Sequence, residues 1–105
     1  TVLENRGIDG CAWGQSSTWH VILGQKVPNR TAGDLQAPEG IPADVLKSSG
    51  KAGLNTPLAI AMALEGVDLF NGGGLLSIAH TEGDIDFTIA AFNTSLTRLQ
   101  ADGLL

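Results

Sequence analysis

The stretch TEGDIDFTIAAFNTSLTRL, Thr81–Leu99, is the clearest structural signal in the chain. Its large apolar residues step by 4, 3, 4 and 3 positions, a spacing that keeps one face of a helix apolar. They are Ile85, Ile89, Phe92, Leu96 and Leu99. Thr81 and Asp84 form a capping box with Asp in place of the usual Glu, and Gly103 ends the helix. The stretch therefore predicts a long amphipathic helix whose apolar face packs on another layer.

A second helix is predicted upstream of this one. Thr56 is a favourable N-cap residue, Pro57 suits the first helical position, and Gly66 ends the helix. We expect its packed side to hold Leu58, Ala61, Met62 and Glu65, with Ile60 and Leu64 widening the apolar face.

Four short stretches are predicted as strands. Cys11–Trp13 and Thr18–Leu23 are separated by a short polar break and form an antiparallel hairpin. In the second of these, Trp19, Val21 and Leu23 share one face, and Thr18, His20 and Ile22 share the other. Val67–Phe70 and Leu75–Ala79 are the other two strands, and the glycine-rich turn Asn71–Gly74 joins them.

Two further segments have less regular patterns. Thr1–Gly7 is typical of the last turns of a helix that ends at a glycine, and we expect it to begin inside a larger protein. Residues 24–53 contain three prolines and five glycines and predict a long loop. One short helical turn is expected within it, at Pro42–Lys47.

The fold class follows from the change of period along the chain. The 105 residues have the length of one small domain. Strand-like alternation comes first and helical periodicity comes later, which is typical of an α+β fold. We expect a small antiparallel sheet of three to four strands, covered on one face by the two main helices.

The composition excludes several classes of function. Six Lys and Arg against eleven Asp and Glu give a net charge of −5, and no basic stripe exists to bind nucleic acid. The longest apolar run, Leu58–Leu64, is far shorter than a membrane span. A single cysteine excludes an internal disulfide framework and fits a reducing compartment, so the expected localisation is cytoplasmic.

Few residues are candidates for chemistry. His20 and His80 are the only histidines and, with Cys11, are too few for a zinc site, so no metal is expected. Cys11 has no cationic neighbour in sequence and is expected to be a buried, inert thiol. His80 is expected to fix the corner between a strand and the last helix. The turn Asn71–Gly74 is either a flexible hairpin or a place where a ligand or another domain approaches bare backbone.

Two segments together resemble a known family. Leu64–Phe70 and Leu76–Asp86 resemble the C-terminal region of class-III pyridoxal-phosphate aminotransferases, and most closely the glutamate-1-semialdehyde aminomutase branch. The most specific part is the motif S-x-A-H-T-x-x-D-I, here Ser77–Ile85. The resemblance is strong over Pro57–Leu99, weaker over Glu4–Leu23, and poor across the predicted long loop.

The resemblance implies a specific architecture and activity. The chain would be the C-terminal small domain of a fold-type-I enzyme, which transfers an amino group on an amino acid or amino-ketone substrate. Pyridoxal phosphate would be held by a large domain of the same enzyme, and the parent enzyme would be dimeric. The lysine that binds the cofactor lies in that large domain in the family. Lys26, Lys47 and Lys51 match no family motif, so the isolated segment is expected to be inactive and to bind no cofactor.

The resemblance also implies roles for individual residues. Ser77, His80, Thr81 and Asp84 would be structural parts of the motif, and no residue of this chain would be catalytic. Gly72, Gly73 and His20 would lie near the substrate. Gly72 stands where the aminomutase branch has a glutamate, five residues before the motif serine. This departure favours an aminotransferase-like subgroup over a mutase.

A second hypothesis for the function belongs to a different class. The chain could be a free-standing acidic protein-interaction module without catalysis, in which the glycine turn and the long loop bind a partner. If it is instead a piece of a two-domain enzyme, the isolated chain should self-associate through the side that holds Trp13, Trp19 or Leu75.

Overall fold

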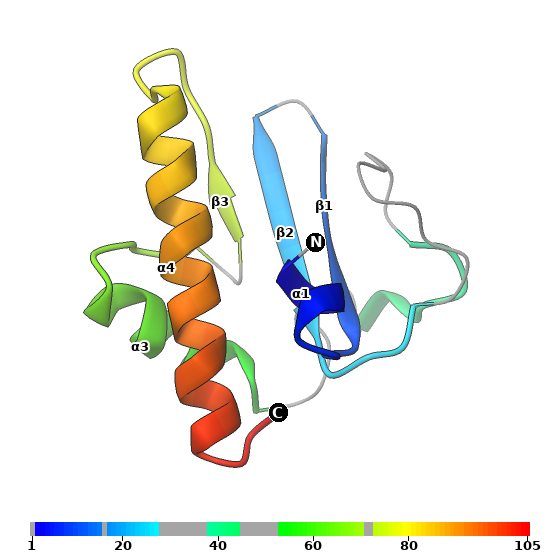
Figure 1. The fold of residues 1–105 in the computed structure, drawn as a ribbon. Coiled ribbons are helices and arrows are strands. Elements are labelled where there is room, and N and C mark those ends of the chain that lie inside the picture. The colour runs from blue at the N-terminus through cyan, green and yellow to red at the C-terminus, as the bar shows by residue number, and fades with distance from the viewer. Residues whose placement is uncertain (1, 16, 28–37, 45–52, 71–72) are drawn as a thin grey trace.

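The computed structural model describes residues 2–15, 17–27, 38–44, 53–70 and 73–105. It confirms the α+β prediction: a three-stranded antiparallel sheet is packed with helices in one small domain (Figure 1). In chain order, the elements are α1 (Val2–Asn5), β1 (Gly10–Gln15), β2 (Thr18–Leu23), α3 (Asn55–Leu64), β3 (Gly73–Leu75) and α4 (Glu82–Ala101).

The sheet has the strand order β1-β2-β3, and both pairings are antiparallel. The predicted hairpin is confirmed, with Trp13 opposite His20 and Gln15 opposite Thr18. β3 pairs with the first half of β2, so that His20 lies opposite Gly73. This register brings the glycine-rich segment against the strand that carries Trp19, with Gly74 opposite Trp19.

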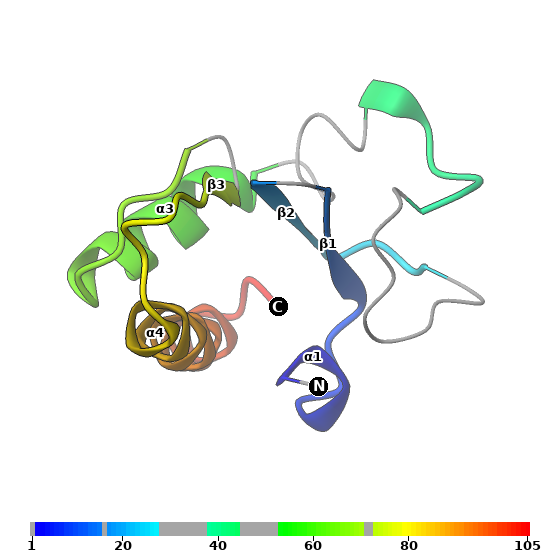
Figure 2. The same ribbon diagram turned by 90° about the horizontal axis from the view of Figure 1, so that it is seen from above.

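The core lies where β2 meets the helices. Val21 and Leu23 of β2 pack with residues of α1, α3 and α4, and Trp19, on the same strand face, packs at the edge of this cluster. Figure 2 shows the helices α3 and α4 to one side of β2 and β1, with α1 near the C-terminal end of the chain. The buried residues of this core are Leu3, Val21, Leu23, Leu54, Leu58, Met62, Ala91, Leu96 and Leu99.

Each helix ends at a glycine with a positive φ angle, as the sequence predicts. Gly7, Gly66 and Gly103 have φ angles of 65°, 90° and 75°. In all three cases the residue after the glycine donates its N–H to the carbonyl of the residue five positions before it, which is the Schellman arrangement. These bonds are Ile8 to Leu3 (3.0 Å), Val67 to Met62 (2.9 Å) and Leu104 to Leu99 (3.0 Å). The caps turn an apolar residue back towards each helix.

Arg6 fastens the N-terminal segment to α4. Its guanidinium donates to Asn93 Oδ1 at 2.7 Å, Thr97 Oγ1 at 2.7 Å and Gln100 Oε1 at 3.1 Å. The three acceptors follow one another at positions 93, 97 and 100 and therefore lie on one flank of the C-terminal half of α4. Residues far apart in sequence are thus joined beside the core.

Two expectations for α3 are wrong. The N-cap is Leu54 and not Thr56, since the carbonyl of the buried Leu54 already accepts the first helical bond, from Leu58 N–H at 3.0 Å. The face is also narrower than predicted, because α3 packs mainly on α4. Leu58, Ala61 and Met62 are buried, whereas Ile60 and Leu64 are 58% and 67% exposed.

The predicted strands around the glycine turn need correction. Residues 67–69 are not a strand, and Phe70 makes only an isolated bridge to Gly73. The second strand is Gly73–Leu75 instead of Leu75–Ala79, because the chain turns at Ile78 and Ala79. Within the predicted long loop, Ala43 and Asp44 are helical. Residues 45–47 of the expected helical turn lie outside the described residues.

The buried hydroxyl group of Ser95 is expected to lower the stability of the chain. It is 0% exposed, and its Oγ has no hydrogen-bond partner among the described residues. Replacing Ser95 by Ala should raise the free energy of unfolding by about 1 kcal/mol or more, because a buried hydroxyl without a partner is destabilising. Urea unfolding of the 105-residue chain measures this change.

Thr94→Ala is the matched control, because Thr94 is exposed on the same helix and reports only the difference in helix propensity, about 0.5 kcal/mol. A loss of stability in Ser95→Ala would mean that the hydroxyl makes a bond essential to the core.

Candidate functional site

The sequence-predicted site residues fall in two adjoining places. His20 and Gly73 lie opposite each other on β2 and β3. Ser77, His80, Thr81 and Asp84 form the corner that leads from β3 into α4. Gly72 lies outside the described residues. The structure therefore places His20 beside Gly73. It separately joins the residues of the structural motif in one corner.

His20 stacks on the indole of Trp13. The two ring centroids are 4.4 Å apart and the ring planes meet at 28°. The contact arises because the residues are opposite in the hairpin register and share the strand face of Ile22. Trp13 Nε1 is buried and has no hydrogen-bond partner among the described residues. Alternation along the strands does not reveal this pair, because it leaves the hairpin register open; pairing Gln15 with Thr18 places Trp13 opposite His20.

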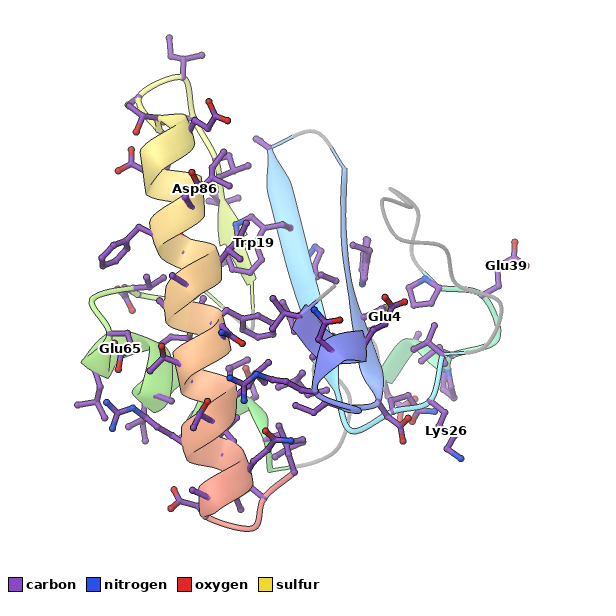
Figure 3. All side chains as sticks on the ribbon, viewed as in Figure 1. Glu4, Trp19, Lys26, Glu39, Glu65 and Asp86 are labelled. Atoms are coloured by element: carbon purple, nitrogen blue, oxygen red, sulfur yellow. The ribbon has the colours of Figure 1, made fainter. Side chains whose placement is uncertain are left out.

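Trp19 explains why β3 contains glycine. A Cβ atom added to Gly74 would lie 2.6 Å from Trp19 Nε1 and 2.8 Å from Trp19 Cζ2. Gly73 is equally restricted, because a Cβ there would collide with the backbone of Trp19. Figure 3 shows Trp19 between α4 and the hairpin. At Gly73 and Gly74, the residue that approaches the bare backbone is therefore Trp19 of the same chain.

Ser77 and His80 hold the corner after β3. The Ser77 N–H donates to His80 Nδ1 at 3.0 Å, and the His80 N–H donates back to the Ser77 carbonyl at 3.0 Å. Ser77 Oγ accepts from the Ala79 N–H at 3.2 Å. Because Nδ1 accepts a backbone proton, the neutral imidazole carries its own proton on Nε2. The expected structural role of His80 matches this geometry.

The same two residues do not form a nucleophilic dyad. Ser77 Oγ lies 3.5 Å from His80 Nδ1, too long for a serine hydroxyl poised for deprotonation, and Nδ1 already accepts from the backbone. Both side chains are exposed. The arrangement shapes the backbone and does not activate an oxygen.

Thr81 and Asp84 complete the predicted capping box. The Thr81 N–H donates to Asp84 Oδ2 at 2.8 Å, and the Asp84 N–H donates to Thr81 Oγ1 at 3.2 Å. The backbone hydrogen bond from Thr81 is the main cause that lowers the pKa of Asp84, with smaller contributions from the Thr81 side chain and from His80. A carboxyl group held ionised in this way cannot serve as a general acid at neutral pH.

The described residues do not fit a covalent site for pyridoxal phosphate. Such a site needs a lysine amine that is desolvated and fixed. Lys26 is exposed, and Figure 3 shows it on the far side of the hairpin from Trp19. Lys47 and Lys51 lie outside the described residues. Cys11 is buried, as predicted.

Alanine substitution of a glycine beside Trp19, compared with that of a glycine away from it, tests the packing of Trp19. Gly74→Ala should destabilise the chain by about 1–3 kcal/mol, because the new methyl group overlaps the indole and must displace it. Tryptophan fluorescence should shift in the same variant, and urea unfolding gives the stability change.

Gly83→Ala is the control, because its Cβ would lie 3.6 Å from Thr81 Oγ1, an ordinary contact, and alanine favours the helix. This variant should be neutral or stabilising. Equal stability of both variants would contradict the packing argument.

The capping box makes stability depend on pH. Since the pKa of Asp84 is lower in the folded chain than in the unfolded chain, its stabilising effect is fully present above about pH 4. The effect is lost as the pH falls through the folded-state pKa. Asp84→Ala should therefore be less stable than the wild type at pH 7, and the difference should shrink in acid. Urea unfolding at a series of pH values measures both.

Asp86→Ala is the control, because Asp86 also lies in the first turns of α4 and makes no hydrogen bond among the described residues. A difference between Asp84→Ala and wild type that stayed constant down to pH 2 would contradict this account.

Comparisons with known proteins add no family. No protein-family model matches the chain, and no curated protein matches it. Across the described parts of the chain, no group of three or more histidine, cysteine or acidic side chains could hold a metal ion. The same residues include no helix with the length and apolar character needed to cross a membrane.

Proposed function

We propose that this chain is the C-terminal small domain of a class-III pyridoxal-phosphate aminotransferase. The observation that carries the proposal is the corner between β3 and α4. Every polar residue of the motif S-x-A-H-T-x-x-D-I has a hydrogen bond in this corner, through Ser77, His80, Thr81 and Asp84. A motif shared across a family for its backbone geometry should have this property.

The corner leads the chain from β3 into α4. It follows directly after β3, in which Gly73 lies opposite His20. In the proposed enzyme, this end of the sheet borders the substrate. The Trp13 ring fixes the imidazole of His20 from one side. His20 would then serve as a positioning group for the substrate, and Gly72 would leave room for it. Gly73 is close-packed on the Trp19 backbone, so its part would be to keep β3 beside His20.

The proposed cofactor belongs to another part of the enzyme. When bound there, pyridoxal phosphate supplies the electron sink that amino transfer requires. The described residues of this chain contribute no lysine suited to it. Their task in the proposed enzyme is to close over the large domain, to exclude water and to shape the substrate entrance.

The expected partners follow from the same proposal. They are the large cofactor-binding domain and a second copy of the enzyme, in the cytoplasm. Of the side chains expected at the exposed interface, Leu75 is exposed and Trp13 and Trp19 are half-buried. Self-association of the isolated chain stays a prediction, which sedimentation at micromolar concentration can test.

The decisive experiment uses the complete reading frame that encodes these residues. We expect an upstream α/β domain with a lysine after a strand, a cofactor absorbance band that borohydride fixes to that lysine, and amino transfer between an amino acid and a keto acid. The isolated 105-residue chain, the matched control, should show no borohydride-fixed adduct.

Two outcomes would overturn the proposal. One is a complete reading frame without such a domain, which would favour the free-standing interaction module. The other is a stoichiometric adduct on a specific lysine of the isolated chain.

A further inference from the structure

The apolar face of α4 is only partly covered. The spacing places Ile85 and Ile89 in line with Leu96 and Leu99, and the last two are buried. Ile85 and Ile89 are 43% and 51% exposed. These two isoleucines, called the open ridge below, continue the core face of α4 beyond the core of this domain.

Carboxylates lie along one side of the open ridge. Glu82 lies three residues before Ile85 and Asp86 three residues before Ile89, so each acid is a surface neighbour of one isoleucine. Figure 3 shows Asp86 on this upper half of α4. Neither acid has an ion-pair partner among the described residues. The chain contains no lysine or arginine between Lys51 and Arg98.

This charge pattern argues against a second copy as the occupant. A symmetric pairing of two open ridges would bring the carboxylates of both copies together without a cation between them. Two of the described cations are already engaged: Arg6 binds α4 through three hydrogen bonds, and Arg98 pairs with Glu65 at 2.8 Å. An apolar surface with a basic flank is complementary to the ridge.

We propose that the open ridge binds an amphipathic α-helix of another protein, apolar on one face and flanked by lysine or arginine. Residues spaced by four form the ridges that interlock when two helices pack, and Ile85 and Ile89 have this spacing. The isoleucines would supply the apolar contact, and Glu82 and Asp86 would select the basic flank. This proposal does not depend on the amino-transfer activity.

A pair of synthetic peptides tests the proposal on the 105-residue chain. The first is a fluorescent helical peptide with leucines at i, i+3, i+4 and i+7 and lysines on both flanks. The second has glutamates in place of the lysines. Fluorescence anisotropy should show binding of the lysine peptide only, and its affinity should fall as salt is raised.

Three double variants locate the binding surface. Ile85→Gln with Ile89→Gln should weaken binding on the order of tenfold or more. Glu82→Gln with Asp86→Asn should weaken it several-fold and reduce its salt dependence. Ile60→Gln with Leu64→Gln, which removes side chains that are 58% and 67% exposed on α3, should leave binding unchanged. Far-UV circular dichroism verifies that each variant is folded.

Several results would overturn the proposal. These are equal binding of the glutamate peptide, equal weakening by the α3 variant, or no effect of the isoleucine variant. Sedimentation supplies another: a homodimer that the isoleucine variant dissociates would make a second copy the occupant. Failure of these tests would leave the assay of amino transfer by the complete enzyme unaffected, so the two proposals fail separately.

Discussion

The close contact between Trp19 and the two glycines of β3 determines how near β3 lies to β2. A Cβ atom on Gly74 would overlap the Trp19 ring, and a Cβ atom on Gly73 would overlap the Trp19 backbone. β3 can therefore approach β2 only with glycine at both positions. Once this strand is in place, its end determines where the chain must reverse and where α4 can begin. The corner and the start of the long helix follow directly from this strand.

The sequence predicted where helices end better than it predicted which of their apolar residues are buried. The capping box at Thr81 and the stops at Gly7, Gly66 and Gly103 were confirmed, because each depends on residues next to it in the chain. The hairpin was also confirmed. These are local signals, and local physics decides them.

Predictions that required knowledge of neighbouring layers were less successful. The spacing of Ile60, Leu64, Ile85 and Ile89 shows which face each side chain occupies, but burial depends on what covers that face. The predicted bounds of the strands near β3 were wrong because glycine is a poor strand former, and its use there depends on the close approach of Trp19, which is distant in sequence. The stack of Trp13 on His20 needed the hairpin register, which alternation alone does not give.

The two halves of α4 are restrained very differently, and in mechanical terms the helix is a cantilever. Its C-terminal half is fixed by Leu96 and Leu99 in the core and by Arg6 on the outside. Its N-terminal half is attached to the corner at Ser77–Asp84 and leaves Ile85 and Ile89 exposed. A load applied near Ile85 therefore acts at the long end of a lever. It would bend the free end of the helix together with the corner, while the clamped end and β3, which is held on β2 by Trp19, would move less.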